Sequence, residues 1–333
     1  MYIPSVESVV VLRSRIPNDA RGKALLDYLC ERFRYYPRER WLDELNRGRV
    51  QIDGKTADGH ERLRGRMELR FEKLHREPAV DGGYRVLHAD ETWLAVDKPA
   101  HLPMHADGPF MRHTLVHMLR TQFDDELQLV HRLDRETSGV CIAARSKAVQ
   151  AALQPQFSGA TESKGERHPV AERVGKTYLA VVHGELGRDQ LCDRPIGHAA
   201  AGTVRLRRSA ADDAIEPKPA CTRFEVVTQA NNRTLVRCLP ETGRTHQIRV
   251  HLEQLGHPIV GDRLYGRADA DYLAFVHRMK AGEDVFEDRT DGFHRHLLHA
   301  HQLRLRHPTT NQQVTFEAPV PDDFRRAMQP DDS

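Results

Sequence analysis

The sequence predicts an α+β fold, in which a small α+β module precedes a large domain built on a mainly antiparallel mixed sheet. Two observations predict this class. Short alternating stretches, typical of strands, outnumber helical stretches after residue 84, and the first 75 residues carry helix and strand patterns of their own. Polar, turn-rich residues lie between these parts. We therefore expect a module over 1–75, a linker over 76–83, a main domain over 84–325 and a tail over 326–333.

The first module is predicted to contain two helices followed by two strands. Apolar residues at helical spacing predict helices over 23–33 and 39–47. Alternation over 49–55 predicts a strand that enters an Asp53-Gly54 turn, and a second strand is expected over 67–71. This order of elements indicates a compact unit with its own apolar core.

The main domain is predicted to be rich in short strands with a few helices between them. Strands are expected over 84–88, 93–97, 140–144, 177–182, 222–228, 234–239, 302–306 and 313–316. Helices are expected over 113–122, 147–157, 244–255 and 268–280. Charged or acidic stretches over 158–175 and 281–292 are expected to be surface insertions.

Composition excludes several classes of protein. The mean hydropathy is −0.62 and no run approaches the roughly 18 apolar residues of a membrane span. The five cysteines form no Cys-x-x-Cys pair, so neither a disulfide framework nor a zinc ribbon is indicated. The net charge is only +2, and 41 of the 50 basic residues are arginine, which suits phosphate recognition but also follows from a GC-rich genome. Charge alone therefore does not decide whether RNA is a partner.

Two separated segments carry the chemistry. In residues 131–139 (HRLDRETSG), Asp134 lies between two arginines, and flanking guanidiniums keep a carboxylate ionised and in place, as a nucleophile requires. A second arginine-rich segment, TGRTHQIRVH, follows at residues 242–251. Together these segments resemble the RluA-type family of RNA pseudouridine synthases. The resemblance extends over residues 84–325 and implies that the larger domain has the pseudouridine synthase fold.

The resemblance implies roles for four residues. Asp134 is the catalytic aspartate, which either adds to ribose C1′ or abstracts the C2′ proton, and Arg249 is the arginine that pairs with it. Tyr178 corresponds to the active-site tyrosine, whose ring can stack on uracil. Arg132 replaces the flipped base in the RNA stack, because chemistry on a stacked base requires its extrusion.

Three further residues are expected in RNA contacts. Arg244 is expected to contact phosphate or backbone from the start of its helix, on a different face from Arg249. Lys176 is expected to support the RNA backbone. His131 belongs to the base-flipping segment, where it is expected to be a hydrogen-bonded structural histidine. The module over 1–75 resembles an S4-type RNA-binding domain, although Tyr35-Tyr36-Pro37 replaces the usual serine-arginine start of its second helix.

The implied function is isomerisation of uridine to pseudouridine in structured RNA. Large-subunit ribosomal RNA is the leading candidate substrate, and transfer RNA is the alternative. This reaction oxidises nothing, so no cofactor or metal is expected. Since no membrane span or signal peptide is indicated, we expect a cytoplasmic protein without a membrane partner, and a monomer. One alternative is a metal-dependent hydrolase, because histidines at 294, 296, 299 and 301 include His-x-His pairs. Another is a non-catalytic RNA-binding protein. The intact Asp134, Tyr178 and Arg249 argue against the latter.

Overall fold

The computed structural model describes residues 1–157, 174–281, 283 and 285–329. Two compact units divide the chain: Val6–Arg76 forms the smaller one, and Met1–Ser5 with Glu77–Ser333 forms the larger one. Each unit is described by itself. None of the helices in the described ranges has both the length and the apolar character needed to cross a bilayer.

The smaller unit is a four-stranded sheet with two helices. Its sheet order is β2-β5-β3-β4. Its elements are β2 (Val6–Arg15), the short 3₁₀ helix η1 (Asn18–Ala20), α1 (Leu25–Arg32), α2 (Arg38–Asn46), β3 (Val50–Ile52), β4 (Lys55–Thr56) and β5 (Glu68–Glu77). Both predicted helices and the two predicted strands are present within a few residues. Positive φ angles of 49° at Asp53 and 80° at Gly54 form the predicted tight turn between β3 and β4.

A closed apolar core holds the smaller unit together. The helices contribute Leu25, Leu29 and Trp41, all at most 1% exposed, and the sheet contributes Val50 and Phe71. The Trp41 indole packs on Phe71 and donates its Nε1–H to the Phe33 carbonyl. The strand β2 was not predicted, because most of its apolar residues are exposed and no polar–apolar alternation marks it.

The larger unit is built on one mixed sheet, to which ten strands contribute among the described residues. Its main path is β12-β16-β17-β11-β18-β10-β8-β7, and β19 and β9 pair at the side. The strands are β7 (Arg85–Ala89), β8 (Trp93–Lys98), β9 (Gln128–Leu129), β10 (Ser138–Ala144), β11 (Gly175–His183), β12 (Gln190–Asp193), β16 (Cys221–Ala230), β17 (Arg233–Pro240), β18 (Leu298–Arg306) and β19 (Gln313–Glu317). Every pairing is antiparallel except β10 with β18. This confirms the predicted fold class.

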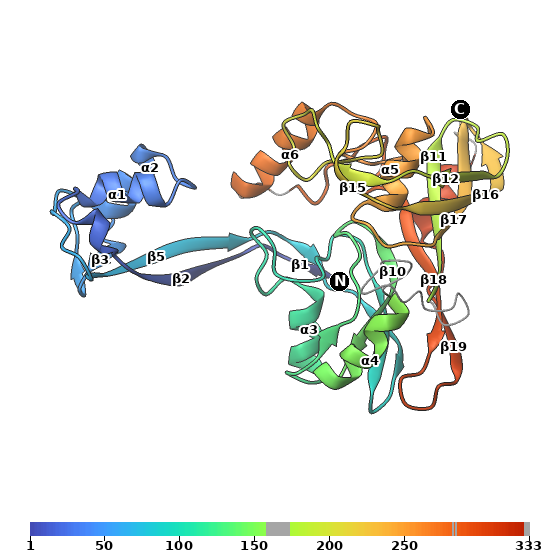
Figure 1. Cartoon of the computed structure of the whole chain (residues 1–333), viewed down its shortest axis with the longest axis horizontal. Coiled ribbons are helices and arrows are strands. Elements are labelled where there is room, and N and C mark those ends of the chain that lie inside the picture. Colours follow the sequence, from blue (N-terminus) through green and yellow to red (C-terminus); the bar gives the residue numbers. More distant parts are fainter. Residues whose placement is uncertain (158–173, 282, 284, 330–333) are drawn as a thin grey trace. The chain divides into compact units, whose positions relative to one another are not determined.

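Smaller elements complete the larger unit. Its helices are α3 (Leu115–Gln122), α4 (Lys147–Phe157), α5 (Gln247–Gln254), α6 (Asp269–Ala281) and α7 (Asp322–Met328). A two-stranded sheet pairs β1 (Tyr2–Ile3) with β6 (Val80–Asp81), and a three-stranded sheet contains β13 (Ile196–His198), β14 (Arg208–Ser209) and β15 (Ile215–Lys218). Figure 1 labels most of these elements along the chain.

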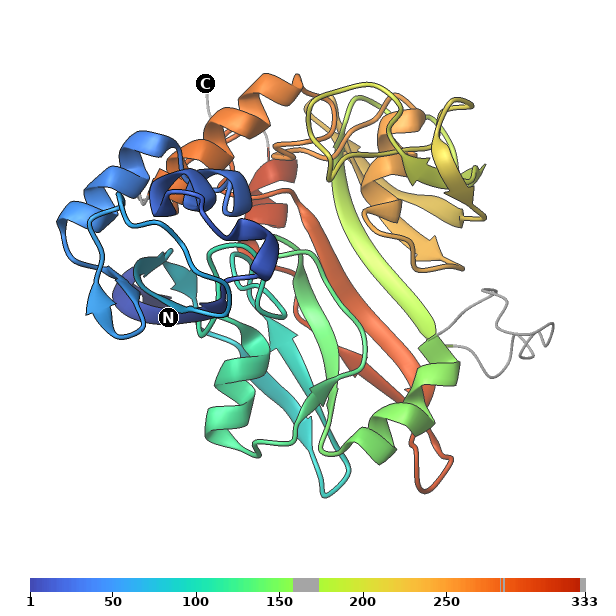
Figure 2. The ribbon, with the colours of Figure 1, turned by 60° about the vertical axis from the view of Figure 1, so that its left-hand side comes forward.

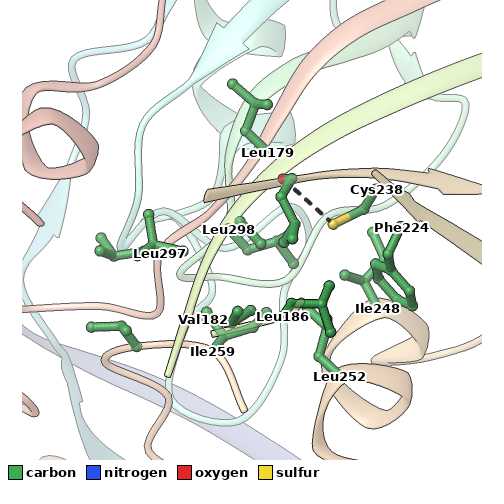
Figure 3. Packing of buried hydrophobic residues seen from close by; sticks show 14 of the residues in the cluster. Leu179, Val182, Leu186, Phe224, Cys238, Ile248, Leu252, Ile259, Leu297 and Leu298 are labelled. Carbon is green, nitrogen blue, oxygen red and sulfur yellow. Dashed lines mark hydrogen bonds between the residues drawn. The ribbon is translucent and has the colours of Figure 1, made fainter. Parts of the chain in front are cut away.

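Strand alternation explains how the main sheet is covered on both faces. In β8, Leu94 and Val96 face a cluster that includes the α3 residues Leu115 and Leu119, whereas Trp93 faces a cluster with α4 and β19. A third cluster lies over β11, β16 and β17, where Phe224 packs against Ile248 and Leu252 of α5 (Figure 3). The sheet core therefore fixes the position of α5, which carries Arg249.

The strand β18 organises the centre of the sheet. Its first half lies between β11 and β10, and its second half pairs with β19. Figure 2 shows β11 and β18 running side by side along most of their length. Because Ser138 and Leu179 are both register partners of His299, the start of β10 and the middle of β11 lie on opposite sides of the same residue of β18.

Three predicted boundaries differ from the structure. Residues 77–83 are not a free linker, because Val80 is fully buried and β6 pairs with β1, which also places residues 1–5 in the larger unit. The predicted tail at 326–333 begins too early, since α7 continues to Met328 with Phe324 and Ala327 buried. Residues 330–333, and most of the predicted insertion at 158–175, lie outside the described residues.

Gly139 is the residue that permits the parallel junction of β10 with β18. Its φ is +113°, and a Cβ there would lie 2.2 Å from the Ala300 carbonyl oxygen. We expect Gly139→Ala to lower the free energy of unfolding by at least about 2 kcal/mol, because neither backbone can retreat. Gly187→Ala is the matched control, since nothing lies within 4 Å of its Cβ. Equal denaturation midpoints for both variants would contradict this reasoning.

Candidate active site

The segment that carries Asp134 is extended and ends in a tight turn. Leu133 is buried and Arg132 is exposed, so the backbone alternates as predicted, although residues 131–134 form no strand. The Thr137 amide donates to the Asp134 carbonyl and closes the turn. Lys98 stabilises the same turn, because its fully buried ammonium donates a hydrogen bond to the Arg135 carbonyl at 3.1 Å.

Arg249 connects Asp134 to a second carboxylate, Asp262. Its Nη1 donates to Asp134 Oδ2 at 2.9 Å, while Nε and Nη2 bind the two Asp262 oxygens at 2.7 and 2.8 Å. Asp262 is 1% exposed and also accepts the amides of Leu264 and Tyr265. A guanidinium held by two bonds on one side presents its remaining edge in one orientation, so Asp262 orients Arg249 toward Asp134.

The helix of Arg249 begins at Gln247, three residues later than predicted. Residue His246 is left-handed (φ 60°, ψ 16°) and so cannot continue a right-handed helix. The buried Gln247 side chain fixes this start: its oxygen accepts from Thr242 Oγ1 and from the Arg244 amide, and its nitrogen donates to the Cys221 carbonyl. The predicted helical faces of Arg244 and Arg249 therefore do not apply, because Arg244 precedes the helix.

The left-handed turn places His246 between Asp134 and Tyr265. Its Nε2 lies 3.9 Å from Asp134 Oδ2, and its Nδ1 lies 2.8 Å from the Tyr265 hydroxyl. The Tyr265 ring also packs under Arg249, with the guanidinium carbon 4.8 Å from the ring centroid. His246, Asp262 and Tyr265 were not predicted as site residues. A Gly-Asp-x-x-Tyr-Gly signal at 261–266 follows the arginine segment, but its partners become visible only in the fold.

The electrostatics favour an ionised Asp134 beside a neutral His246. Burial opposes ionisation of Asp134, but the His246 ring and the Arg249 guanidinium outweigh burial and hold its carboxyl pKa below the ordinary value. Burial lowers the pKa of His246 to about 4, so the ring is uncharged near neutral pH. Burial raises the pKa of Tyr178 above its ordinary value, and the phenol stays protonated.

A cavity of about 260 Å³ opens above the Asp134 carboxylate. The structure brings all seven predicted site residues to its wall: His131, Arg132, Asp134, Lys176, Tyr178, Arg244 and Arg249. Tyr178 reaches it because the β11–β18 register shifts between Thr177 and Leu179, and such a bulge redirects a side chain. The cavity therefore joins an anion, cations and an aromatic ring.

The remaining predicted residues differ in what they contact. Arg132 is exposed at the cavity, whereas Arg244 donates its Nε–H to the Pro219 carbonyl at 3.0 Å. Lys176 is mostly buried, with its ammonium 5.7 Å from the Phe157 ring centroid, and burial lowers its pKa. His131 stacks on Phe157 and accepts the Ile142 amide at Nε2, which is the structural role expected of it.

The histidine run from 294 to 301 supports the sheet and the Asp134 turn. His296 Nε2 lies 2.7 Å from Thr137 Oγ1, and His299 Nδ1 lies 2.9 Å from Ser138 Oγ. His301 Nδ1 hydrogen-bonds to the Ala318 carbonyl. Across the residues that the structure describes, no three His, Cys, Asp or Glu side chains are grouped to hold a metal ion. Hydrogen bonds within the fold therefore account for His296, His299 and His301.

Comparisons with known proteins agree with this site. Residues 92–254 match the family model described as RNA pseudouridylate synthase. Among relatives, "Ribosomal large subunit pseudouridine synthase D" of Xanthomonas campestris is 34% identical and covers 94% of this chain and 90% of its own length. "RNA pseudouridine synthase 7" of Arabidopsis thaliana is 32% identical over 79% of this chain and 66% of its own length. The solved "Human RNA Pseudouridylate Synthase Domain Containing 1" superposes with a TM-score of 0.53 at 25% identity, covering 75% of this chain and 97% of that one. The chain therefore belongs to the RluA-type family of RNA pseudouridine synthases.

Proposed function

We propose that this enzyme isomerises specific uridines of large-subunit ribosomal RNA and that Asp134 is the group that acts on the sugar. The observation that carries the assignment of Asp134 is its 2.9 Å ion pair with Arg249 at the wall of a cavity that Tyr178 also lines. A carboxylate kept ionised by a fixed guanidinium is suited to attack a carbon centre or remove a proton.

The reaction is balanced without an external reagent. The bond between uracil N1 and ribose C1′ breaks, the ring turns, and a bond from C5 to C1′ forms, while C5 loses a proton and N1 gains one. Asp134 assists either by adding to C1′ or by taking the C2′ proton. Tyr178 provides a neutral ring against which the detached uracil can stack.

Ribosomal RNA is proposed as the substrate because relatives in several bacteria carry the name "Ribosomal large subunit pseudouridine synthase D". Transfer RNA is the second candidate. In the smaller unit, residues 6–76, there are 17 lysines and arginines against 12 acidic residues, although the whole chain has a net charge of only +2. This excess supports RNA binding by a module that we propose to be S4-like. We propose that the enzyme acts as a monomer in the cytoplasm.

Arg132 is proposed to fill the gap that the extruded base leaves. It is exposed at the cavity and two residues from Asp134, and its planar cation can stack between bases. We expect Arg132→Ala to reduce kcat/KM about 100-fold on a structured stem-loop but less than tenfold on an unstructured RNA of the same sequence, since only the former requires extrusion. Single-turnover assays on both RNAs measure this ratio. Equal losses on the two RNAs would refute the stacking role.

The substrate is tested by mapping pseudouridine in total RNA from cells with and without the gene. Loss of specific sites in large-subunit ribosomal RNA, restored by the wild-type gene, is the expected result. If pseudouridine sites were lost only from transfer RNA, transfer RNA would be the substrate in place of ribosomal RNA. An unchanged map, together with no isomerisation of purified RNA, would indicate a non-catalytic RNA-binding protein.

A further inference from the structure

His246 is the polar residue beside Asp134 to which neither the sequence nor the family assignment gives a role. Its side chain is only 7% exposed and lines the cavity. The 3.9 Å between its Nε2 and Asp134 Oδ2 exceeds a hydrogen bond, so the nitrogen faces the carboxylate without binding it. The main chain adopts a left-handed conformation at His246 to hold the ring there, and this conformation is uncommon for residues other than glycine.

The position of the His246 proton follows from its other neighbour. The Arg208 amide donates to the Tyr265 hydroxyl oxygen at 3.1 Å, and His246 Nδ1 lies 2.8 Å from the same oxygen. We assign the phenolic proton to the bond with His246, because Nδ1 then provides it with an acceptor. With Nδ1 as acceptor, the proton of the neutral ring lies on Nε2. The cavity therefore contains an N–H donor directed at the space beside the Asp134 carboxylate.

The sugar atoms that must occupy this space are defined by the proposed reaction. A carboxylate oxygen that acts at C1′ or C2′ lies close to the oxygen attached to C2′. A donor 3.9 Å from the same carboxylate oxygen is within reach of that hydroxyl. The 2′-hydroxyl is also the group that distinguishes RNA from DNA at a single position.

We infer that the Nε2–H of His246 donates a hydrogen bond to the 2′-hydroxyl of the target nucleotide, which makes His246 a specificity-determining residue for a ribonucleotide at that position. The inference rests on the proposed action of Asp134 on the sugar. Tyr265 is the positioning residue, because its hydroxyl fixes the imidazole tautomer.

The test measures RNA affinity, since binding can be compared without turnover. An Asp134→Asn background binds a large-subunit ribosomal RNA fragment that the wild-type enzyme modifies, carrying either uridine or 2′-deoxyuridine at the target position. We expect the deoxy substitution to weaken binding about five- to tenfold in this background, and less than twofold after His246→Asn is added. Asparagine tolerates the left-handed backbone but is too short to place an N–H at Nε2.

Two further variants distinguish recognition from a structural effect. His246→Gln can extend an amide N–H toward the former Nε2 position, so it should retain part of the discrimination. Tyr265→Phe should reduce discrimination while retaining the ring packing under Arg249. Discrimination that is absent in the Asp134→Asn background, or equal in all variants with unchanged thermal unfolding, would overturn the inference. Failure of the proposed function has a different readout, because the wild-type enzyme would then form no pseudouridine in large-subunit ribosomal RNA.

Discussion

Asp134→Ala is expected to reduce pseudouridine formation by on the order of 10⁴-fold or more, while the folded protein and its RNA affinity remain. The variant removes the acidic side chain that lies closest to the sugar in the proposed reaction. Its partner does not become an uncompensated buried charge, because Arg249 keeps both bonds to Asp262. The Asp134 side chain is 22% exposed, so its loss opens no closed cavity in the core.

Two variants control this experiment. Asp134→Asn has the same shape but cannot act as nucleophile or base, so it should be as inactive as the alanine variant. Asp212 also forms an ion pair with an arginine, Arg194, but its side chain is 96% exposed. Asp212→Ala should therefore leave activity unchanged. Full activity of Asp134→Asn on the modified RNA would show that another group performs the reaction.

Short motifs predicted the residues that contact substrate better than the residues that orient them. Asp134 and Arg249 lie 115 positions apart, and the family resemblance paired them before any contact was known; the structure places them 2.9 Å apart. The short apolar runs at 93–97 and 140–144 also located β8 and β10, whose residues are all buried. Local pattern and family motif were sufficient for these features.

Tertiary contacts explain what the sequence could not reveal. Asp262 orients Arg249 only because α5 and the loop after it pack together, so sequence spacing does not indicate the bidentate pair. The helix start at Gln247 depends on a side-chain network with Thr242 and Cys221, which overrides the helical periodicity that begins at Arg244. The strand β2 depends on pairing with β5, because its own exposed residues lack the alternation of a half-buried strand.

Arg249→Met is expected to abolish activity and also to lower the free energy of unfolding by about 3–5 kcal/mol at neutral pH. Methionine fills much of the volume and suits a helix, so lost packing is a minor effect. The main effect is electrostatic, because Asp262 is 1% exposed and would lose the guanidinium that binds both of its carboxylate oxygens. Denaturant titration at pH 7.5 measures the loss.

The pH dependence separates this explanation from simple loss of contacts. In the wild-type protein the pKa values of Asp134 and Asp262 lie below their ordinary values, so their stabilisation is present above about pH 4 and is lost as the pH falls through the folded values. In Arg249→Met, burial of Asp262 without the guanidinium raises its carboxyl pKa above the unfolded value, so the folded state binds an extra proton on acidification. The stability difference between the two proteins should therefore be largest near pH 7.5 and shrink toward pH 5.

A double variant tests the same argument from the opposite side. Arg249→Met with Asp262→Asn removes both buried charges, and the asparagine oxygen can still accept the amide of Leu264. Most of the lost stability should return, because the uncompensated carboxylate is gone, whereas activity should stay lost because Asp134 has no oriented cation. Recovery of stability without activity would show that the fold is stable with both charges or with neither, and is destabilised only when Asp262 is left without Arg249. A double variant as unstable as Arg249→Met would mean that packing around α5, and not charge, causes the loss.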